Sequence, residues 1–359
     1  MPIHQVLVSA SPGDAITNSA IELRDLLRRI GPSEVFARNI HPAVADDVTD
    51  LAKYFLSASP QPREDILLYH ASIGDPEVFG FVADRPERLV LVYHNISPAE
   101  AFAPYEPGFA GLLAAGRQDL ALLRDRVALA LCDSAYNAAE LVALGYDDVR
   151  VSPLIVDPRS LHEVELDDGT VRHLDEVTEG PVILFVGQIL PHKRPELLVH
   201  AFHALVTYLI PEAHLIMVGN RRLPRFAAAV QQQIVELGLH RAWITGAVAP
   251  ETLRALYESA DLFATASDHE GFCVPLLEAM SFDLPIVARA TTAVPETLGG
   301  AGLLLDPDDG PIVMAEAWAE VLTDPGVRDG LVARGRDRLQ DFDPEHARRQ
   351  VLEHLLSVV

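Results

Sequence analysis

The chain has 359 residues, of which 49% are apolar and 22% are charged, and its formal net charge is -24. This composition excludes a disordered chain, and the length exceeds what one hydrophobic core usually supports, so we expect two folded domains. The negative charge argues against general affinity for nucleic acid, whose phosphates require clustered Lys and Arg, and we predict no nucleic-acid partner.

Two cysteines, Cys132 and Cys273, lie far apart in the sequence. They show neither metal-ligand spacing nor a disulfide framework, which favours a reducing compartment. The N-terminus has no charged leader, and no apolar run reaches the length of a bilayer span. We therefore predict a cytoplasmic protein that is neither secreted nor membrane-spanning.

Short apolar runs alternate with amphipathic stretches in both halves of the chain, which is typical of an α/β fold. In the first half a helix is expected from about residue 17, and strands are expected at 5–10, 66–69, 89–93 and 127–132. In the second half strands are expected at 182–186, 214–218, 242–245, 262–264 and 286–288. The repetition predicts two Rossmann-like, doubly wound domains that face each other across a cleft.

An acidic, polar stretch separates the two halves and predicts an interdomain linker within residues 157–180. The N-terminal domain is expected at 1–165 and the C-terminal domain at 175–340. Residues 341–359 are expected to form a helix that packs back toward the first domain.

The segment 267–280 carries two glutamates, Glu270 and Glu278, between an expected strand and an expected helix. Carboxylates at this point can accept hydrogen bonds from sugar hydroxyls, and a helix N-terminus favours anionic phosphates. The backbone N–H groups that would point at such a ligand come from the residues around the helix start, which are Gly271, Phe272, Cys273 and Val274. Two isolated glutamates would more often be a helix cap and a solvated side chain.

This segment resembles the EX7E signature of retaining glycosyltransferase family 4, whose members have the GT-B fold of two facing Rossmann-like domains. The similarity continues through residues 284–288 and 295–304. The resemblance implies that Glu270 and the backbone that follows it hold the donor sugar. It also implies that Glu278 holds the ribose hydroxyls of the nucleotide.

A second segment, 186–198, places a glycine turn and a basic loop after the first strand of the second domain. Gly187 allows the turn, and Lys193 can act as a point charge on a leaving diphosphate; the alternative is a solvated basic loop. The resembled family usually has an arginine after the glycine, whereas this chain has Gln188. A neutral amide contributes no charge, so Arg194 or another cation would have to compensate.

Two residues of the first domain complete the predicted site. His94 ends the run 89–93, where a histidine can also serve a structural role by bonding to backbone carbonyls. The resemblance implies that His94 lies at the donor sugar, and His70 is a weaker candidate. Gly13 is the single glycine of the loop 9–15, which takes the place of the family's glycine-bearing loop at the donor phosphate and acceptor.

The resemblance implies transfer of a hexosyl group, with retention of configuration, from a nucleotide-diphosphate sugar to a hydroxyl of a sugar, glycolipid or small molecule. The first domain would then face the acceptor and the second would bind the donor. His94, Lys193 and Glu270 are the predicted catalytic residues. No cofactor is expected besides the donor as co-substrate.

No metal is expected either, because Lys193 and the helix N-terminus can neutralise a diphosphate, and the acidic run at 306–309 is expected to be a solvated turn. Two alternatives are a sugar-nucleotide epimerase or hydrolase of the same fold and a non-catalytic donor-binding subunit. Three arginines, Arg24, Arg28 and Arg29, give weak support for peripheral membrane contact. The sequence specifies neither the donor base and sugar nor the acceptor or the oligomeric state.

Overall fold

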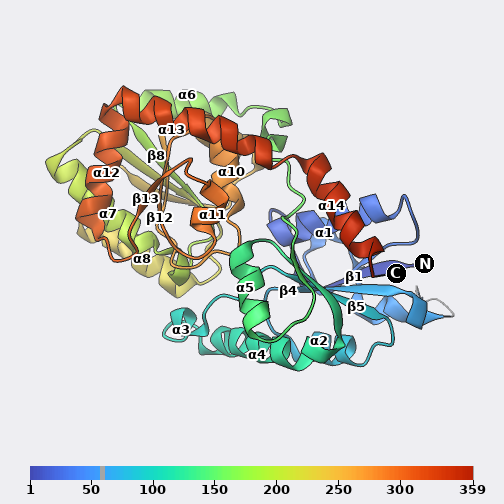
Figure 1. Ribbon diagram of the computed structural model, residues 1–359. Coiled ribbons are helices and arrows are strands. Elements are labelled where there is room, and N and C mark those ends of the chain that lie inside the picture. The colour runs from blue at the N-terminus through green and yellow to red at the C-terminus, as the bar shows by residue number, and fades with distance from the viewer. Residues whose placement is uncertain (57–60, 359) are drawn as a thin grey trace. The chain divides into compact units, whose positions relative to one another are not determined.

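The computed structural model describes residues 1–56 and 61–358, and these form two compact units, each built on its own sheet (Figure 1). Unit 1 contains Met1–Ala103, Pro107–Val156 and the segment from Asp343 onward. Unit 2 contains Pro104–Glu106 and Asp157–Phe342. The prediction of two Rossmann-like α/β units is confirmed.

Unit 1 has a parallel sheet with the strand order β3-β2-β1-β4-β5-β6-β7. Its strands are β1 (Ile3–Ala10), β2 (Val35–Ile40), β3 (Thr49–Asp50), β4 (Ile66–Ala71), β5 (Arg88–Tyr93), β6 (Val127–Cys132) and β7 (Val149–Val151). Its α-helices are α1 (Ala15–Leu27), α2 (Pro76–Ala83), α3 (Ala99–Phe102), α4 (Pro107–Leu123), α5 (Ala135–Ala143) and α14 (Pro344–Leu356). Figure 1 shows α1 and α14 on one face of this sheet and α2, α4 and α5 on the other.

The last helix, α14, contributes to the core of unit 1. Val351 and Leu355 are 5% and 1% exposed and pack in one cluster with the leucines of α1 and the apolar residues of β4, β5 and β6. Arg348 also forms an ion pair with Glu22 of α1 at 3.0 Å. Residues far apart in the sequence therefore close the same face of the sheet.

Unit 2 has a second parallel sheet with the order β10-β9-β8-β11-β12-β13. Its strands are β8 (Val182–Val186), β9 (His214–Val218), β10 (Ala242–Gly246), β11 (Leu262–Thr265), β12 (Ile286–Arg289) and β13 (Leu303–Leu305). Its helices are α6 (Asp168–Val177), α7 (Pro195–Tyr208), α8 (Pro224–Glu236), α9 (Pro250–Glu258), α10 (Val274–Ser281), α11 (Val294–Leu298), α12 (Pro311–Thr323) and α13 (Pro325–Arg338).

Each sheet has a point at which the strand order reverses. In unit 2 the chain proceeds outward from β8 to β10 and then restarts on the other side of β8 with β11. In unit 1 the same reversal lies between β1 and β4. Ligands of open parallel sheets bind beyond the carboxyl ends of the strands at such a switch point, so the loops after β8 and β11 are the expected ligand loops of unit 2.

The predicted linker is folded. The change from unit 1 to unit 2 comes at Asp157, and the acidic stretch that follows forms a 3-10 turn (Ser160–Glu163) and helix α6. Asp167 caps α6 by accepting hydrogen bonds from the backbone N–H and the hydroxyl of Thr170 at 3.0 and 2.7 Å, and Leu174 is 6% exposed. The acidic composition predicts an interdomain linker, but an N-cap and a buried leucine make the segment a packed helix.

Candidate active site

The loop after β8 turns sharply and then starts helix α7. The backbone N–H of Gly187 donates to Val218 at 2.9 Å, while Gln188 is exposed. A 3-10 turn (Pro191–Lys193) follows, and Arg194 adopts a left-handed conformation with φ of 52° before α7 begins. This turn places Lys193 at the carboxyl end of β8.

The loop after β11 brings Glu270 to Lys193. The Nζ atom of Lys193 donates to both carboxylate oxygens of Glu270, at 2.6 and 2.5 Å, and the two side chains are 19% and 7% exposed. Burial by itself would lower the pKa of Lys193, but the attraction of Glu270 outweighs it and the pKa is raised. The switch point of unit 2 therefore holds a charged lysine against a carboxylate.

Threonines from the segment after β12 brace the Glu270 loop. The backbone N–H of Glu270 donates to Oγ1 of Thr292 at 2.8 Å. The hydroxyls of Thr291 and Thr297 donate to the backbone carbonyls of Ser267 and Phe272 at 2.5 and 2.6 Å. Three hydroxyls thus fix the backbone on both sides of the carboxylate.

Helix α10 begins directly after this loop. Gly271 leads into Phe272, which is 6% exposed, and Cys273 takes a left-handed conformation with φ of 73° before Val274 opens the helix. The N-cap residue Cys273 makes no side-chain capping hydrogen bond to this turn. Its backbone N–H groups and the helix dipole are therefore suited to an anion.

Glu278 lies on α10, and its carboxylate accepts a hydrogen bond from the hydroxyl of Tyr257 at 2.7 Å. Burial raises the pKa of Glu278, and the tyrosine bond partly opposes this shift. Tyr257 is fully buried. One carboxylate oxygen is thus fixed by the protein, which orients the group for a further hydrogen bond.

Arg194 does not supply a free charge in place of the arginine that Gln188 replaces. Its guanidinium donates to Asp268 at 2.9 Å and to Glu196. Asp268 also pairs with Arg289 and donates its backbone N–H to the carbonyl of His192 at 2.7 Å. The carboxylate of Asp268 therefore joins the loops after β8 and β11 to strand β12.

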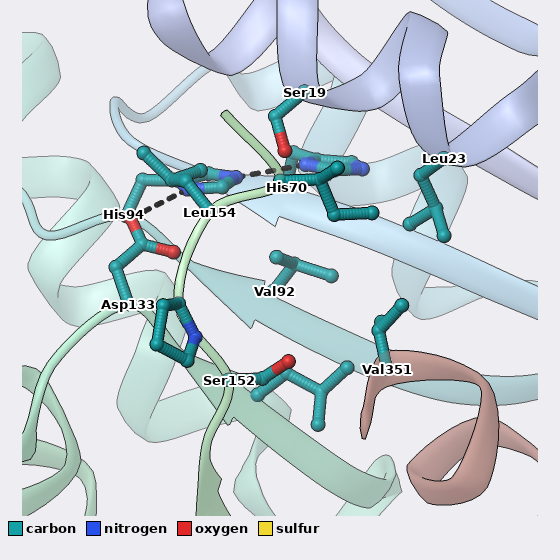
Figure 2. Close-up of a pocket in the computed structure, with 12 residues that line it drawn as sticks. Ser19, Leu23, His70, Val92, His94, Asp133, Ser152, Leu154 and Val351 are labelled. Atoms are coloured by element: carbon teal, nitrogen blue, oxygen red, sulfur yellow. Dashed lines mark hydrogen bonds and ion pairs between the residues drawn. The ribbon is translucent and has the colours of Figure 1, made fainter. Parts of the chain in front are cut away.

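The remaining predicted residues belong to unit 1. Gly13 lies in the exposed turn after β1 with φ of 70°. His94 follows β5, and both of its ring nitrogens have partners inside the unit: Nδ1 lies 2.8 Å from Asp133, and Nε2 lies 2.8 Å from His70 (Figure 2). This arrangement fits the structural alternative for His94, because neither nitrogen is left for a substrate.

The structure thus brings Lys193, Glu270, Gly187 and Gln188 to neighbouring loops of unit 2, with Glu278 one turn into α10. Within the described residues, no group of three or more His, Cys, Asp or Glu side chains is arranged to hold a metal. The acidic run 306–309 forms a turn in which Asp306 and Asp309 accept hydrogen bonds from backbone N–H groups of the same turn at 2.9 and 2.8 Å.

Sequence reasoning missed the residues that support the site. Tyr257, Asp268 and Thr292 come from separate elements, and their partners depend on how these elements fold against one another. The paired threonines before the proline-led helix α11 are a weak sequence signal for such a brace.

Two of the three arginines that gave weak support for membrane contact are paired within unit 1. Arg24 is 5% exposed and forms an ion pair with Asp47, and Arg28 forms an ion pair with Glu34.

These loops lie in a part of the chain that a known family covers. Residues 180–324 match the family of glycosyl transferases group 1. We call residues 180–324 the group 1 segment. It contains β8 to β13 and every predicted site residue of unit 2.

A curated relative of the group 1 segment is O-antigen chain mannosyltransferase B of Escherichia coli. It is 34% identical over 171 residues, which cover 47% of this chain and 44% of that protein. The chain therefore matches less than half of that relative's own length.

Solved structures extend the likeness to the whole chain at the level of the fold. Sucrose-phosphate synthase from Thermosynechococcus elongatus superposes with a TM-score of 0.78 at 18% identity, covering 100% of both chains. HepE of Anabaena, solved in complex with UDP-glucose, gives 0.75 at 21% identity over 99% of this chain and 100% of that chain. The predicted GT-B fold class is confirmed.

Within residues 1–56 and 61–358, the helices are too short or too polar to reach across a membrane.

Proposed function

We propose that this protein is a retaining glycosyltransferase of family 4 that moves a sugar from a nucleotide-diphosphate sugar to an acceptor hydroxyl. The observation that carries the proposal is the Lys193–Glu270 ion pair, which lies at the switch point of unit 2 and within the group 1 segment. An amine and a carboxylate in contact there suit a ligand that has both an anionic leaving group and hydroxyls.

In the proposed reaction the charged amine of Lys193 stabilises the diphosphate as it leaves, together with the N-terminus of α10. Glu270 accepts hydrogen bonds from hydroxyls of the donor sugar. The bond between the anomeric carbon and the diphosphate oxygen breaks, and the acceptor oxygen bonds to the anomeric carbon on the same face. The acceptor proton passes to the departing phosphate, so no general base from the protein is required.

Gln188 makes this leaving-group site less positive than in the resembled family. Because Arg194 is held by Asp268 and Glu196, the structure supports Lys193 as the main positive side chain of the site. Gln188 is exposed and can donate only neutral hydrogen bonds to a phosphate oxygen. We propose that the turn at Gly187 and the backbone near α10 provide the remaining donors.

Glu278 is proposed to bind the ribose of the donor nucleotide. We expect Glu278→Gln to weaken binding of the ribonucleotide donor by about 10- to 100-fold, because a hydrogen bond to a charged group contributes about 1.5–3 kcal/mol. The measurement is a thermal-shift and turnover screen of UDP-, GDP-, ADP- and dTDP-sugars, followed by titration of the preferred diphosphate and its 2′-deoxy form.

If Glu278 binds the 2′ hydroxyl, the 2′-deoxy form should bind the wild type and Glu278→Gln with similar affinity. Glu251→Gln, an exposed change on α9, is the matched control and should leave binding unchanged. A variant that binds ribo- and deoxynucleotides as the wild type does would contradict the ribose site. Hydrolysis without transfer would favour the hydrolase alternative, and binding without turnover would favour a donor-binding subunit.

We also propose that the reaction needs no metal and no further cofactor. Turnover should survive an excess of EDTA, because Lys193 and the start of α10 supply the positive charge that a divalent ion would otherwise provide. Loss of turnover in EDTA that Mg²⁺ or Mn²⁺ restores would contradict this proposal.

A cytoplasmic location is proposed from the two cysteines, which are both free thiols. The acceptor is proposed to be a sugar, a glycolipid or a small hydroxyl compound. The match of residues 180–324 to the glycosyl transferases group 1 family supports transfer in general, and we propose that unit 1 selects the acceptor.

A further inference from the structure

A buried chain of polar side chains crosses four neighbouring strands of unit 1. Gln5 on β1, His70 on β4, His94 after β5 and Asp133 after β6 follow one another in the order of the sheet. Gln5 Oε1 lies 2.9 Å from His70 Nε2. His70 Nδ1 lies 2.8 Å from His94 Nε2, and His94 Nδ1 lies 2.8 Å from Asp133 (Figure 2). All four residues are less than a tenth exposed.

At the Gln5 end of this hydrogen-bond network, the donor and the acceptor can be assigned. Gln5 Nε2 lies 2.9 Å from the backbone carbonyl of Ala20, and a carbonyl can only accept a hydrogen bond. Turning the Gln5 amide over would set its oxygen against that carbonyl. The amide oxygen therefore faces His70, and Nε2 of His70 must carry a proton.

The other end is fixed by Asp133, which lies directly before Ser134, the N-cap of helix α5. A helix N-terminus favours a negative charge, so Asp133 is expected to be an ionised acceptor. Nδ1 of His94 must then carry a proton as well. The hydrogen bond between the two imidazoles lies between nearly parallel rings, whose planes differ by 11°.

The three contacts from Gln5 to Asp133 need three N–H protons, but two neutral imidazoles supply only two. Without a third proton, two lone pairs would face each other inside the unit, and each buried unsatisfied group costs about 1–3 kcal/mol. The network is therefore complete only when one imidazole is a cation.

We propose that His94 is an imidazolium at neutral pH, held between Asp133 and His70, and that Gln5 and His70 are positioning residues that select this state. His94 is the ring that touches the carboxylate, and a cation is best stabilised there. Burial and, next, the charge of His94 lower the pKa of His70 well below its ordinary value, in agreement with a neutral His70.

A small cavity lies beside this network. Its volume is about 20 Å³, roughly enough for one water molecule. Of the side chains that line the cavity, His70, His94 and Asp133 are titratable, while α1, β5, β6 and α14 contribute Ser19, Leu23, Val92, Leu131 and Val351. The proton on His94 is thus balanced by Asp133 alone among the lining groups.

This charge state limits what His94 can do. A ring with two donated N–H bonds has no lone pair, so His94 cannot act as a general base while the network is intact. It acts as a rigid support for the carboxyl end of β5.

The test is the ¹⁵N spectrum of ring nitrogens in the full chain labelled with ¹⁵N-histidine, at pH 7 and with no ligand. His94→Gln and His70→Gln spectra assign the signals. We expect both nitrogens of His94 to be protonated and His70 to show one protonated and one unprotonated nitrogen. An unprotonated nitrogen on His94 would overturn the proposal, whatever the enzyme's activity.

A second variant tests whether Gln5 determines the protonation state of His94. In Gln5→Met, His70 Nε2 no longer needs to donate, so two protons satisfy the two remaining contacts, and His94 should lose its proton from Nε2. Gln118→Met, an exposed change on α4, is the control and should leave the His94 signals unchanged. A doubly protonated His94 in folded Gln5→Met would contradict the role of Gln5, and the wild-type spectrum decides the charge state even if that variant does not fold.

Discussion

Lys193→Met should lower turnover about 100- to 1000-fold with the preferred donor, which is the typical loss when one preorganised charge on a developing anion is removed. The amine lies within 2.6 Å of Glu270, and its raised pKa keeps it charged across the neutral range. Methionine keeps the length of the side chain and removes the charge. The measurement is turnover together with the free energy of unfolding in denaturant.

The stability of the same variant separates a catalytic pair from a structural one. Lys193→Met leaves Glu270, whose side chain is 7% exposed, without its cation, and breaking a buried pair costs about 3–5 kcal/mol. The double variant Lys193→Met/Glu270→Gln removes both charges and should recover most of that stability. Its turnover should stay low, because neither the phosphate charge nor the sugar acceptor is restored.

An active double variant would show that the pair only holds the two loops together and would contradict the proposed donor site. Arg336→Met is a suitable control for the loss of an ion pair. Arg336 forms a bidentate ion pair with Asp283, at 2.6 and 2.7 Å, on the surface of the same unit. Such an exposed pair contributes about 0–1 kcal/mol. Turnover of this control should equal that of the wild type.

The strands of both units could be predicted because buried parallel strands are short, nearly continuous apolar runs. The expected run 182–186 is β8 and the run 214–218 is β9, residue for residue. The sequence analysis did not predict β2, because Arg38 and Asn39 interrupt its apolar pattern. It also did not predict β3, β7 and β13, which have only two or three residues each. The acidic segment was interpreted as a linker, whereas Asp167 caps helix α6 and Leu174 of that helix is buried.

The site was predictable only where one short segment carries it. Glu270, Gly271 and Glu278 lie within nine residues, whereas the contact of Glu270 with Lys193 depends on β8 and β11 being neighbours in the sheet. The bond from Gln5 to His70 depends in the same way on the pairing of β1 with β4. Arg194 does not supply the charge that Gln188 lacks, because its guanidinium is paired with Asp268 and Glu196.

Gly219→Ala should be the most damaging single change in the loops of unit 2. A Cβ atom on Gly219 would lie 1.8 Å from the carbonyl oxygen of Gly187 and 2.5 Å from its carbon, so backbone must move. The φ of 157° is also one that side-chain-bearing residues rarely adopt. Overpacking of this kind costs about 1–3 kcal/mol or more, and we expect a loss of about 3 kcal/mol in the free energy of unfolding.

The backbone movement caused by Gly219→Ala should also alter the proposed donor site. The loop after β9 holds the loop after β8 through the bond from the Ile189 N–H to Asn220 at 3.0 Å, so moving one shifts Gly187 and Gln188. We expect donor affinity, measured by titration below the unfolding temperature, to fall at least about 10-fold, or about 1.4 kcal/mol. Gly310→Ala is the matched control, because its Cβ would meet nothing within 4 Å. A folded Gly219→Ala that binds donor like the wild type would remove Gly187 and Gln188 from the donor site, because the contact that positions them would then have no bearing on binding.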